Sequence, residues 1–195
     1  LGGAFTVCED VVARGVVAYD PVSMRFSALR GGLNNTVFAL QWANGELYAG
    51  GGFTQADGQA ASRIAAWNGS AWRALGGGVD APQPSSPVVY ALSVSADSLH
   101  AGGTFSSAGG APASNVARWN GSQWSALGGG TDGPVRTLLN ANGELIVGGE
   151  FASAGGLGAP AIARWNGSQW LAYGSGLQLG ATRGAVYALA LQSGQ

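Results

Sequence analysis

A short segment that can both accept a glycan and present aromatic rings occurs three times in this chain of 195 residues. The stretch ARWNGSQW appears identically at Ala117–Trp124 and Ala163–Trp170, and the near copy AAWNGSAW lies at Ala65–Trp72. Each copy contains an Asn-Gly-Ser sequon, the acceptor of N-linked glycans in secreted proteins. Each also holds two tryptophans, so the segment is a glycan acceptor, an aromatic sugar-binding platform, or one tight turn of a repeated fold.

Four Asn-x-Ser/Thr sequons make up the glycosylation candidates: Asn34, Asn68, Asn120 and Asn166. Three of them are copies of one motif, so they provide two independent observations rather than four. Asn-Gly between two apolar runs is also a strong hairpin signal, because both residues accept a positive φ. We therefore expect the motif to be structural first, with glycosylation of exposed hairpin tips in a eukaryotic secretory pathway.

Residues suited to catalysis or metal binding are few. The only histidine, His100, lies in SLHAGG at a position aligned with Tyr48 and Ile146, so we expect it to be a packed strand residue. A zinc site takes several His or Cys ligands, and Cys8 is the only cysteine. The glycine blocks lack the Lys-Ser/Thr of a phosphate loop. The sequence predicts no catalytic residue, no metal site, no cofactor and no enzyme activity.

The composition indicates a folded protein of low charge. Hydrophobic residues make up 46% and charged residues 10%, against about 25% charged in an average protein. Net charge is −1, with nine arginines and no lysine. We therefore expect no nucleic-acid partner, and no membrane insertion because no apolar run reaches the ~20 residues of a span. A chain that begins at Leu1 is expected to be a processed product or a fragment.

A repeat of 46 to 52 residues organises the chain. A Gly-Gly-containing motif that ends in phenylalanine recurs, and its phenylalanines are Phe5, Phe53, Phe105 and Phe151. An apolar run lies 16 residues before each of the last three, beginning at Val37, Val89 and Val135, and a fourth run begins at Val186. Each unit contains four short apolar segments bounded by turn residues, as in VYALSV, ELYAGG and the two arms of the Trp hairpin. Four strands in about 40–50 residues are typical of one β-propeller blade.

The unit resembles the Kelch repeat, in which a Gly-Gly pair closes the second strand and an aromatic residue, a turn and a Trp follow. The closest match is VVAYDPVSMRFSAL at Val16–Leu29, with Tyr19-Asp20-Pro21 at the turn and Phe26 in the Trp position. Trp-Asn-Gly replaces Tyr-Asp-Pro in three units. The units also resemble repeats of large secreted and cell-surface proteins, including fungal surface proteins.

The resemblance implies an all-β fold, a β-propeller of four-stranded blades around a channel. We expect one domain or propeller fragment over 1–195, with units at about 1–34, 35–80, 87–132 and 133–178 and a partial unit at 185–195. About four blades then belong to this chain. They are expected to be part of a larger propeller, and the alternative is a four-bladed ring in which VYALAL pairs with the N-terminal LGGAF.

A polar residue follows the glycine-rich block at the end of each unit. In such a fold these residues form a ring near one mouth of the channel: Asn34, Asp80, Asp132 and Gln178. Asp and Asn also cap turns, so these four residues either form a ligand-binding ring or act as turn caps. The leading functional hypothesis is a non-enzymatic extracellular or cell-surface module that contacts other proteins of an assembly, and glycans as further partners. The alternatives are a carbohydrate-binding propeller with exposed Trp residues and a fragment of a propeller enzyme.

Overall fold

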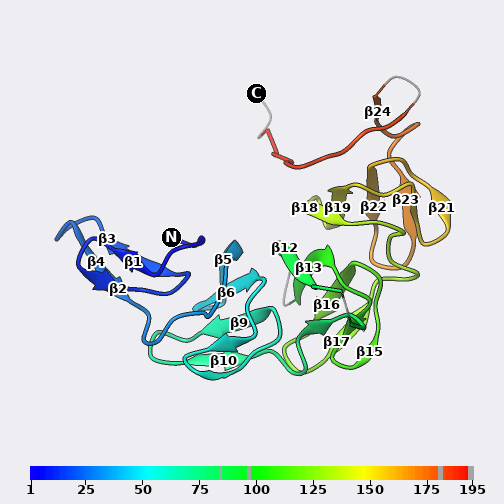
Figure 1. The fold of residues 1–195 in the computed structure, drawn as a ribbon. Coiled ribbons are helices and arrows are strands. Elements are labelled where there is room, and N and C mark those ends of the chain that lie inside the picture. The colour runs from blue at the N-terminus through cyan, green and yellow to red at the C-terminus, as the bar shows by residue number, and fades with distance from the viewer. Residues whose placement is uncertain (84, 96–97, 180–181, 193–195) are drawn as a thin grey trace.

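The computed structural model describes residues 1–83, 85–95, 98–179 and 182–192, and these form an all-β, antiparallel fold without a helix. Three four-stranded sheets follow one another around an open arc (Figure 1). The first sheet contains β5 (Val37–Ala43), β6 (Glu46–Gly51), β9 (Ile64–Trp67) and β10 (Trp72–Ala74). The second contains β12 (Val88–Ser95), β13 (Ser98–Thr104), β16 (Val116–Trp119) and β17 (Trp124–Ala126). The third contains β18 (Val135–Ala141), β19 (Glu144–Gly149), β22 (Ile162–Trp165) and β23 (Trp170–Ala172).

An N-terminal unit precedes these sheets. It contains β1 (Val7–Cys8), β2 (Val11–Val12), β3 (Val17–Asp20) and β4 (Arg25–Ala28). Gly2 forms a bridge with Val16, so the first residues lie beside β3 as a second strand would. The C-terminal segment from Val186 has the sequence of a first strand. It is held by the Val186 N–H, which donates to Gly149 O at 3.1 Å, and it pairs with no second strand in the described part of the chain.

The Ala- and Gly-rich stretches, which the sequence predicts as loops, contain short two-stranded ribbons. They are β7 (Gln55–Ala56) with β8 (Gln59–Ala60), β14 (Ser107–Ala108) with β15 (Ala111–Pro112), and β20 (Ser153–Ala154) with β21 (Leu157–Gly158). β11 (Val79–Asp80) extends the second ribbon, and β24 (Gln178–Leu179) pairs with β25 (Thr182–Arg183). Positive-φ residues such as Asp57 (φ 49°) and Gly58 (φ 77°) make the tip of a ribbon tight enough for pairing.

The first strands of the three sheets lie on the inner side of the arc (Figure 1). Each has a β-bulge directly after the valine that packs on the preceding unit or its equivalent, between Val37 and Ala39, Val89 and Ala91, and Val135 and Thr137. The bulge brings the neighbouring backbone close to the second glycine of the paired strand. A Cβ on Gly103 would lie 1.9 Å from Val88 O, which explains a glycine there.

The first glycine of the pair forms the inner contact between successive units. A Cβ built on Gly50 would lie 2.5 Å from Val89 Cγ1, and one on Gly102 would lie 2.4 Å from Val135 Cγ1. The valine of each first strand therefore packs directly on the backbone of the unit before it. Val89 and Val135 are fully buried as a result.

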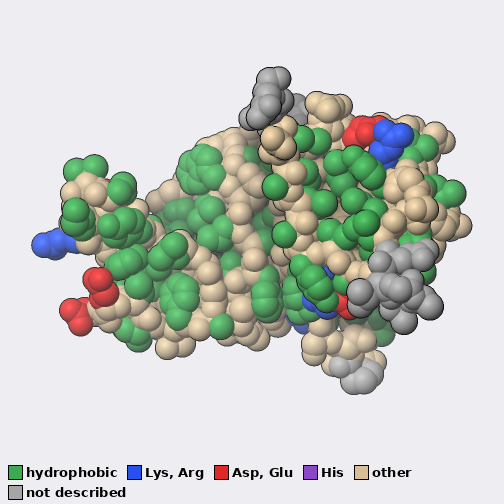
Figure 2. Space-filling view, turned by 90° about the horizontal axis from the view of Figure 1, so that it is seen from above, with side chains coloured by type: hydrophobic (Ala, Val, Ile, Leu, Met, Phe, Trp, Pro, Cys, Tyr) green, Lys and Arg blue, Asp and Glu red, His purple; other side chains and the backbone are tan. Residues whose placement is uncertain are grey.

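Charged residues are sparse on the surface seen from above, and apolar and uncharged side chains cover most of it (Figure 2). The buried residues form clusters that join neighbouring units: Tyr48 and Ile64 of the first sheet pack with Leu99 and Trp124 of the second. The core therefore lies between sheets, so each unit is completed by its neighbour.

We predict that Gly102→Ala destabilises the protein by roughly 1–3 kcal/mol, because the new methyl group overpacks the contact with Val135. Gly158→Ala is the control, since its Cβ would meet nothing within 4 Å at an exposed site in β21. Urea denaturation measures both. Equal free energies of unfolding for the two variants would contradict the close approach between the sheets.

Candidate functional site

The three Trp-Asn-Gly-Ser hairpins share one geometry. Trp67 pairs directly with Trp72, Trp119 with Trp124 and Trp165 with Trp170, so each connection is the four-residue turn rather than the two-residue turn. Gly69 has φ 96°. Asn44 and Gly45, in the other kind of Asn-Gly turn, both have positive φ, at 52° and 77°. The same dipeptide therefore makes two different turns in this fold.

Each sequon asparagine organises its own turn. Asn68 Oδ1 accepts hydrogen bonds from the backbone N–H of Ser70 at 3.0 Å and of Ala71 at 2.9 Å, and from Ser70 Oγ at 3.0 Å. Asn120 and Asn166 accept the same three kinds of bond. All three asparagines are exposed. Because the carbonyl end of the amide makes these bonds, the nitrogen end remains for the solvent side.

The second Trp of every hairpin is buried, with 9%, 8% and 8% of its surface exposed at Trp72, Trp124 and Trp170. Its indole N–H donates to a carbonyl of the preceding unit. Trp124 Nε1 lies 2.7 Å from Leu75 O, and the corresponding bonds are Trp72 to Leu29 at 2.9 Å and Trp170 to Leu127 at 2.8 Å.

These rings therefore belong to the contacts between units, and the expectation of exposed rings at these positions, on which the sugar-platform alternative depends, is wrong. The first Trp of each hairpin lies against the second, with ring centroids 5.4–5.5 Å apart. Trp42 differs from all six, because 63% of its surface is exposed on β5.

We predict that Trp124→Phe costs roughly 1–3 kcal/mol of stability, because it removes the buried indole hydrogen bond between the units together with part of the ring's packing, and leaves the Leu75 carbonyl only the Gly78 N–H as a donor. Trp42→Phe removes a similar group from an exposed ring and should change stability by less than about 0.5 kcal/mol. Thermal and urea unfolding provide the comparison. A cost for Trp42→Phe as large as that for Trp124→Phe would argue against the hydrogen bond as the main contribution.

The polar residues that follow the glycine-rich block of each unit mainly accept hydrogen bonds from backbone N–H groups. Asn34 Oδ1 accepts from the N–H of Thr54 at 2.8 Å and of Gln55 at 2.9 Å. Asp132 makes the same pair of bonds to Ala152 and Ser153. Asp80 Oδ1 instead accepts from Ala81 N, and the side chain of Gln178 lies outside the described part of the structure. Two members thus hold the loop that follows a Gly-Gly-x-Phe segment.

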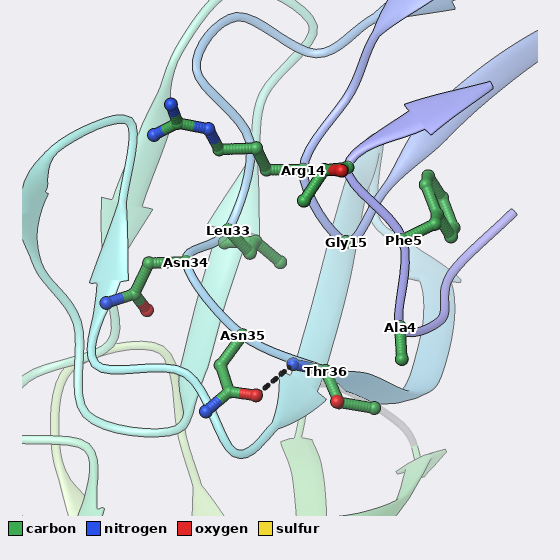
Figure 3. Close-up of a pocket in the computed structure, with 9 residues that line it drawn as sticks. Ala4, Phe5, Arg14, Gly15, Leu33, Asn34, Asn35 and Thr36 are labelled. Atoms are coloured by element: carbon green, nitrogen blue, oxygen red, sulfur yellow. Dashed lines mark hydrogen bonds between the residues drawn. The ribbon is translucent and has the colours of Figure 1, made fainter. Parts of the chain in front are cut away.

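A pocket of about 390 Å³ lies beside Asn34, between the N-terminal unit and the first sheet. In Figure 3 the Asn34 amide points away from the wall that Ala4 and Phe5 form, and Asn35 Oδ1 accepts from the Thr36 N–H at 2.7 Å. The side-chain amides of these two asparagines are thus engaged with nearby backbone rather than converging on the pocket. No group of three His, Cys, Asp or Glu that could hold a metal occurs among the described residues.

His100 is buried in β13, as the alignment with strand residues predicts, and its Nδ1 has no hydrogen-bond partner among the described residues. Burial, and secondly the positive charge of Arg118, lower its pKa from 6.5 to about 4, and the nearby Ser93 backbone opposes this shift only weakly. His100 is therefore neutral at pH 7. Protonating it would place a charge in the space between the second and third sheets.

We predict that stability falls as the pH drops from about 6.5 to about 4, because the unfolded chain then binds a proton on His100 that the folded chain does not. Above pH 6.5 this contribution is fully present, and its loss amounts to at most roughly 3 kcal/mol. His100→Ile introduces the residue found at the equivalent position of the third sheet, Ile146. This variant should show little change in the free energy of unfolding between pH 6.5 and pH 4. Parallel pH profiles of unfolding for the two proteins would contradict the assignment.

A ladder of side chains along the inner strands was not expected from the sequence. The bulged residues Phe38 and Tyr90 meet edge to face with centroids 5.4 Å apart, and the Arg136 guanidinium lies 4.2 Å from the Tyr90 ring centre. Arg136 Nε donates to Glu150 Oε1 at 2.8 Å, and Tyr187 donates to the same oxygen at 3.2 Å. In the sequence, this ladder corresponds to the residue that follows the first-strand valine of each unit, which is Phe, Tyr, Arg and Tyr in turn.

The comparisons with known proteins support the propeller fold. Residues 141–167, from the end of β18 to the third Trp hairpin, match the family described as "Domain of unknown function (DUF5122) beta-propeller". This match supports a β-propeller family and is not specific for Kelch. No curated protein matches the chain. Among the described residues there is no helix long and apolar enough to cross a membrane.

Two computationally designed proteins are among the similar solved structures. Ika8 is 13% identical, with a TM-score of 0.47, over 76% of this chain and 39% of its own, so the chain spans well under half of Ika8. Ika4 is 14% identical, with a TM-score of 0.47, over 76% of this chain and 77% of its own.

Proposed function

We propose that this chain forms blades of a β-propeller that serves as a non-enzymatic interaction module of an extracellular or cell-surface protein. The observation that carries the proposal is the repeated junction between units. Each four-stranded sheet receives a valine from the following unit on its Gly-Gly backbone and donates an indole N–H to a leucine carbonyl of the preceding unit. A junction that recurs with the same geometry turns each unit by a similar step, as propeller blades require.

The hairpin tips support an extracellular location. Three sequons occupy equivalent exposed turns, and in each the serine hydroxyl is hydrogen-bonded to the asparagine amide. A glycan linked to the nitrogen of such a tip would extend into solvent without disturbing the buried second Trp of the hairpin. The low charge of the chain, 10% of its residues, gives it a neutral surface that suits contacts with other proteins of an assembly.

We predict that Asn68, Asn120 and Asn166 carry N-linked glycans when the chain is secreted from a eukaryotic cell. Glycopeptide mass spectrometry before and after enzymatic deglycosylation measures the occupancy at each position. Ser122→Ala should remove the glycan from Asn120 alone, because it destroys the sequon and keeps both backbone bonds of the turn. Asn142, in an exposed Asn-Gly turn without a sequon, is the internal control.

Bare asparagines at all three tips would contradict the secretory part of the proposal. Location is then tested in the native source by limited proteolysis of intact cells, followed by mass spectrometry of the released peptides. Amine-reactive surface labels are unsuitable, because the chain has no lysine. Release of hairpin peptides from intact cells supports the surface location, and their recovery only after lysis would overturn it.

A further inference from the structure

A polar cleft of about 420 Å³ lies between the second and third sheets. One wall comes from a cross-strand row of the second sheet in which Ser93, His100 and Arg118 are register partners. The other wall comes from the third sheet, where Asn140, Leu145 and Trp165 are register partners. The volume is within the range of ligand sites, about 300–1,000 Å³.

The corresponding space between the first and second sheets is filled. Tyr48 stands there at the register position of His100, is 8% exposed, and packs in one cluster with Leu99 and Trp119. Ala66 stands at the register position of Arg118. The second unit thus has the smaller ring of His100 in place of Tyr48, and the guanidinium of Arg118 in place of the Ala66 methyl. These two differences leave a polar cleft where the first unit has a packed contact.

Two buried polar atoms at this cleft have no partner among the described residues. They are His100 Nδ1 and Asn140 Nδ2, from opposite walls, and both residues line the cleft. Only 6% of the His100 surface is exposed. A buried polar atom without a partner destabilises the fold, so a ligand that supplies hydroxyl groups at this place recovers part of that cost.

Arg118 gives the cleft a positive charge. In the third sheet the equivalent Arg164 is bonded to the Glu144 carboxylate, with Nη1 to Oε2 at 3.0 Å. In the second sheet Ser98 takes the place of that glutamate, and Arg118 has no carboxylate partner within the described part of the chain. The cleft therefore offers a guanidinium to an anion from outside the chain.

We propose that this cleft binds an acidic sugar, a pyranose that carries a carboxylate. The carboxylate pairs with Arg118, and the ring hydroxyls meet Asn140, His100 and the serine hydroxyls of Ser95 and Ser98 that border the cleft. Trp165, which borders the same cleft, supplies apolar surface for the C–H groups of the sugar ring. Trp165 is the half-buried ring of the third hairpin, so the site does not require the buried Trp170 to be exposed. The proposal is independent of the proposed role as a protein-interaction module.

The test is a titration of the whole chain with glucuronate, followed by isothermal titration calorimetry and by ¹H–¹⁵N spectra of the tryptophan indoles. Glucose has the hydroxyls without the carboxylate, and acetate has the carboxylate without the hydroxyls. We expect glucuronate to bind at least about tenfold more tightly than either, since both kinds of contact contribute. We expect one shifted indole signal, that of Trp165.

Two variants copy residues of the sibling units and so are suited to the same backbone. Arg118→Ala copies Ala66 and should weaken glucuronate binding about tenfold or more. Asn140→Val copies Val94, and it should weaken glucuronate binding about fivefold because the sugar hydroxyl loses its contact with the Asn140 amide. Arg164→Ala is the matched control, because it removes an arginine one unit away and should leave binding unchanged.

The proposal is overturned if glucuronate causes no heat and no indole shift, or if glucose or acetate binds as tightly. It is also overturned if Arg118→Ala and Arg164→Ala behave alike. Unfolding curves of each variant show whether it is folded, and Arg118→Lys adds a folded variant that keeps the charge but loses the planar fork. Partial binding by Arg118→Lys supports the carboxylate contact, and full binding by Arg118→Ala contradicts it. Asn120 also borders the cleft, so these titrations use the unglycosylated chain from a bacterial host, and their outcome is then separate from that of the glycosylation test.

Discussion

The buried hydrogen bond from an indole N–H to the leucine carbonyl of the preceding unit is the contact on which the fold depends. A single four-stranded sheet of short strands cannot bury both faces, so it needs a neighbour in a fixed position. Between the first and second sheets, Trp124 fixes the outer part of that position through Leu75, and Val89 fixes the inner part through the backbone of Gly50. A polar group and an apolar contact at opposite ends of the junction determine both distance and orientation.

Because those two anchors hold the backbone, the positions between them are free to differ. Tyr48, His100 and Ile146 occupy one register position in three units and produce a packed ring, a buried neutral imidazole and an aliphatic contact. The same freedom acts on the bulged inner residues, where Phe38, Tyr90 and Arg136 stack by different interactions at one place. Chemical variety in this chain is therefore concentrated between units rather than within them.

The sequence predicts the strand pattern and the repeat because both depend on local features, such as Asn-Gly turns, Gly-Gly pairs and alternating apolar residues. It also predicts a packed strand position for His100. It favours a structural role for the Trp hairpins, but it does not identify the partner of each indole N–H, since Trp124 bonds to Leu75 of another unit, 49 residues away in sequence. The cleft was missed for the same reason: its two walls, at Arg118 and Asn140, are polar residues that look unrelated until the sheets are stacked.

A cleft made in this way exists only while two units are held together. Arg118 and His100 come from one sheet and Asn140 from the next, so the distance between the two halves of the site is set by Trp170 on Leu127 and by Val135 on Gly102. A ligand that contacts both walls stabilises the junction by the free energy of its binding. Recognition and stability are thus coupled through one interface. The unpartnered polar atoms that make the cleft costly to the fold are also the atoms that give it chemical selectivity.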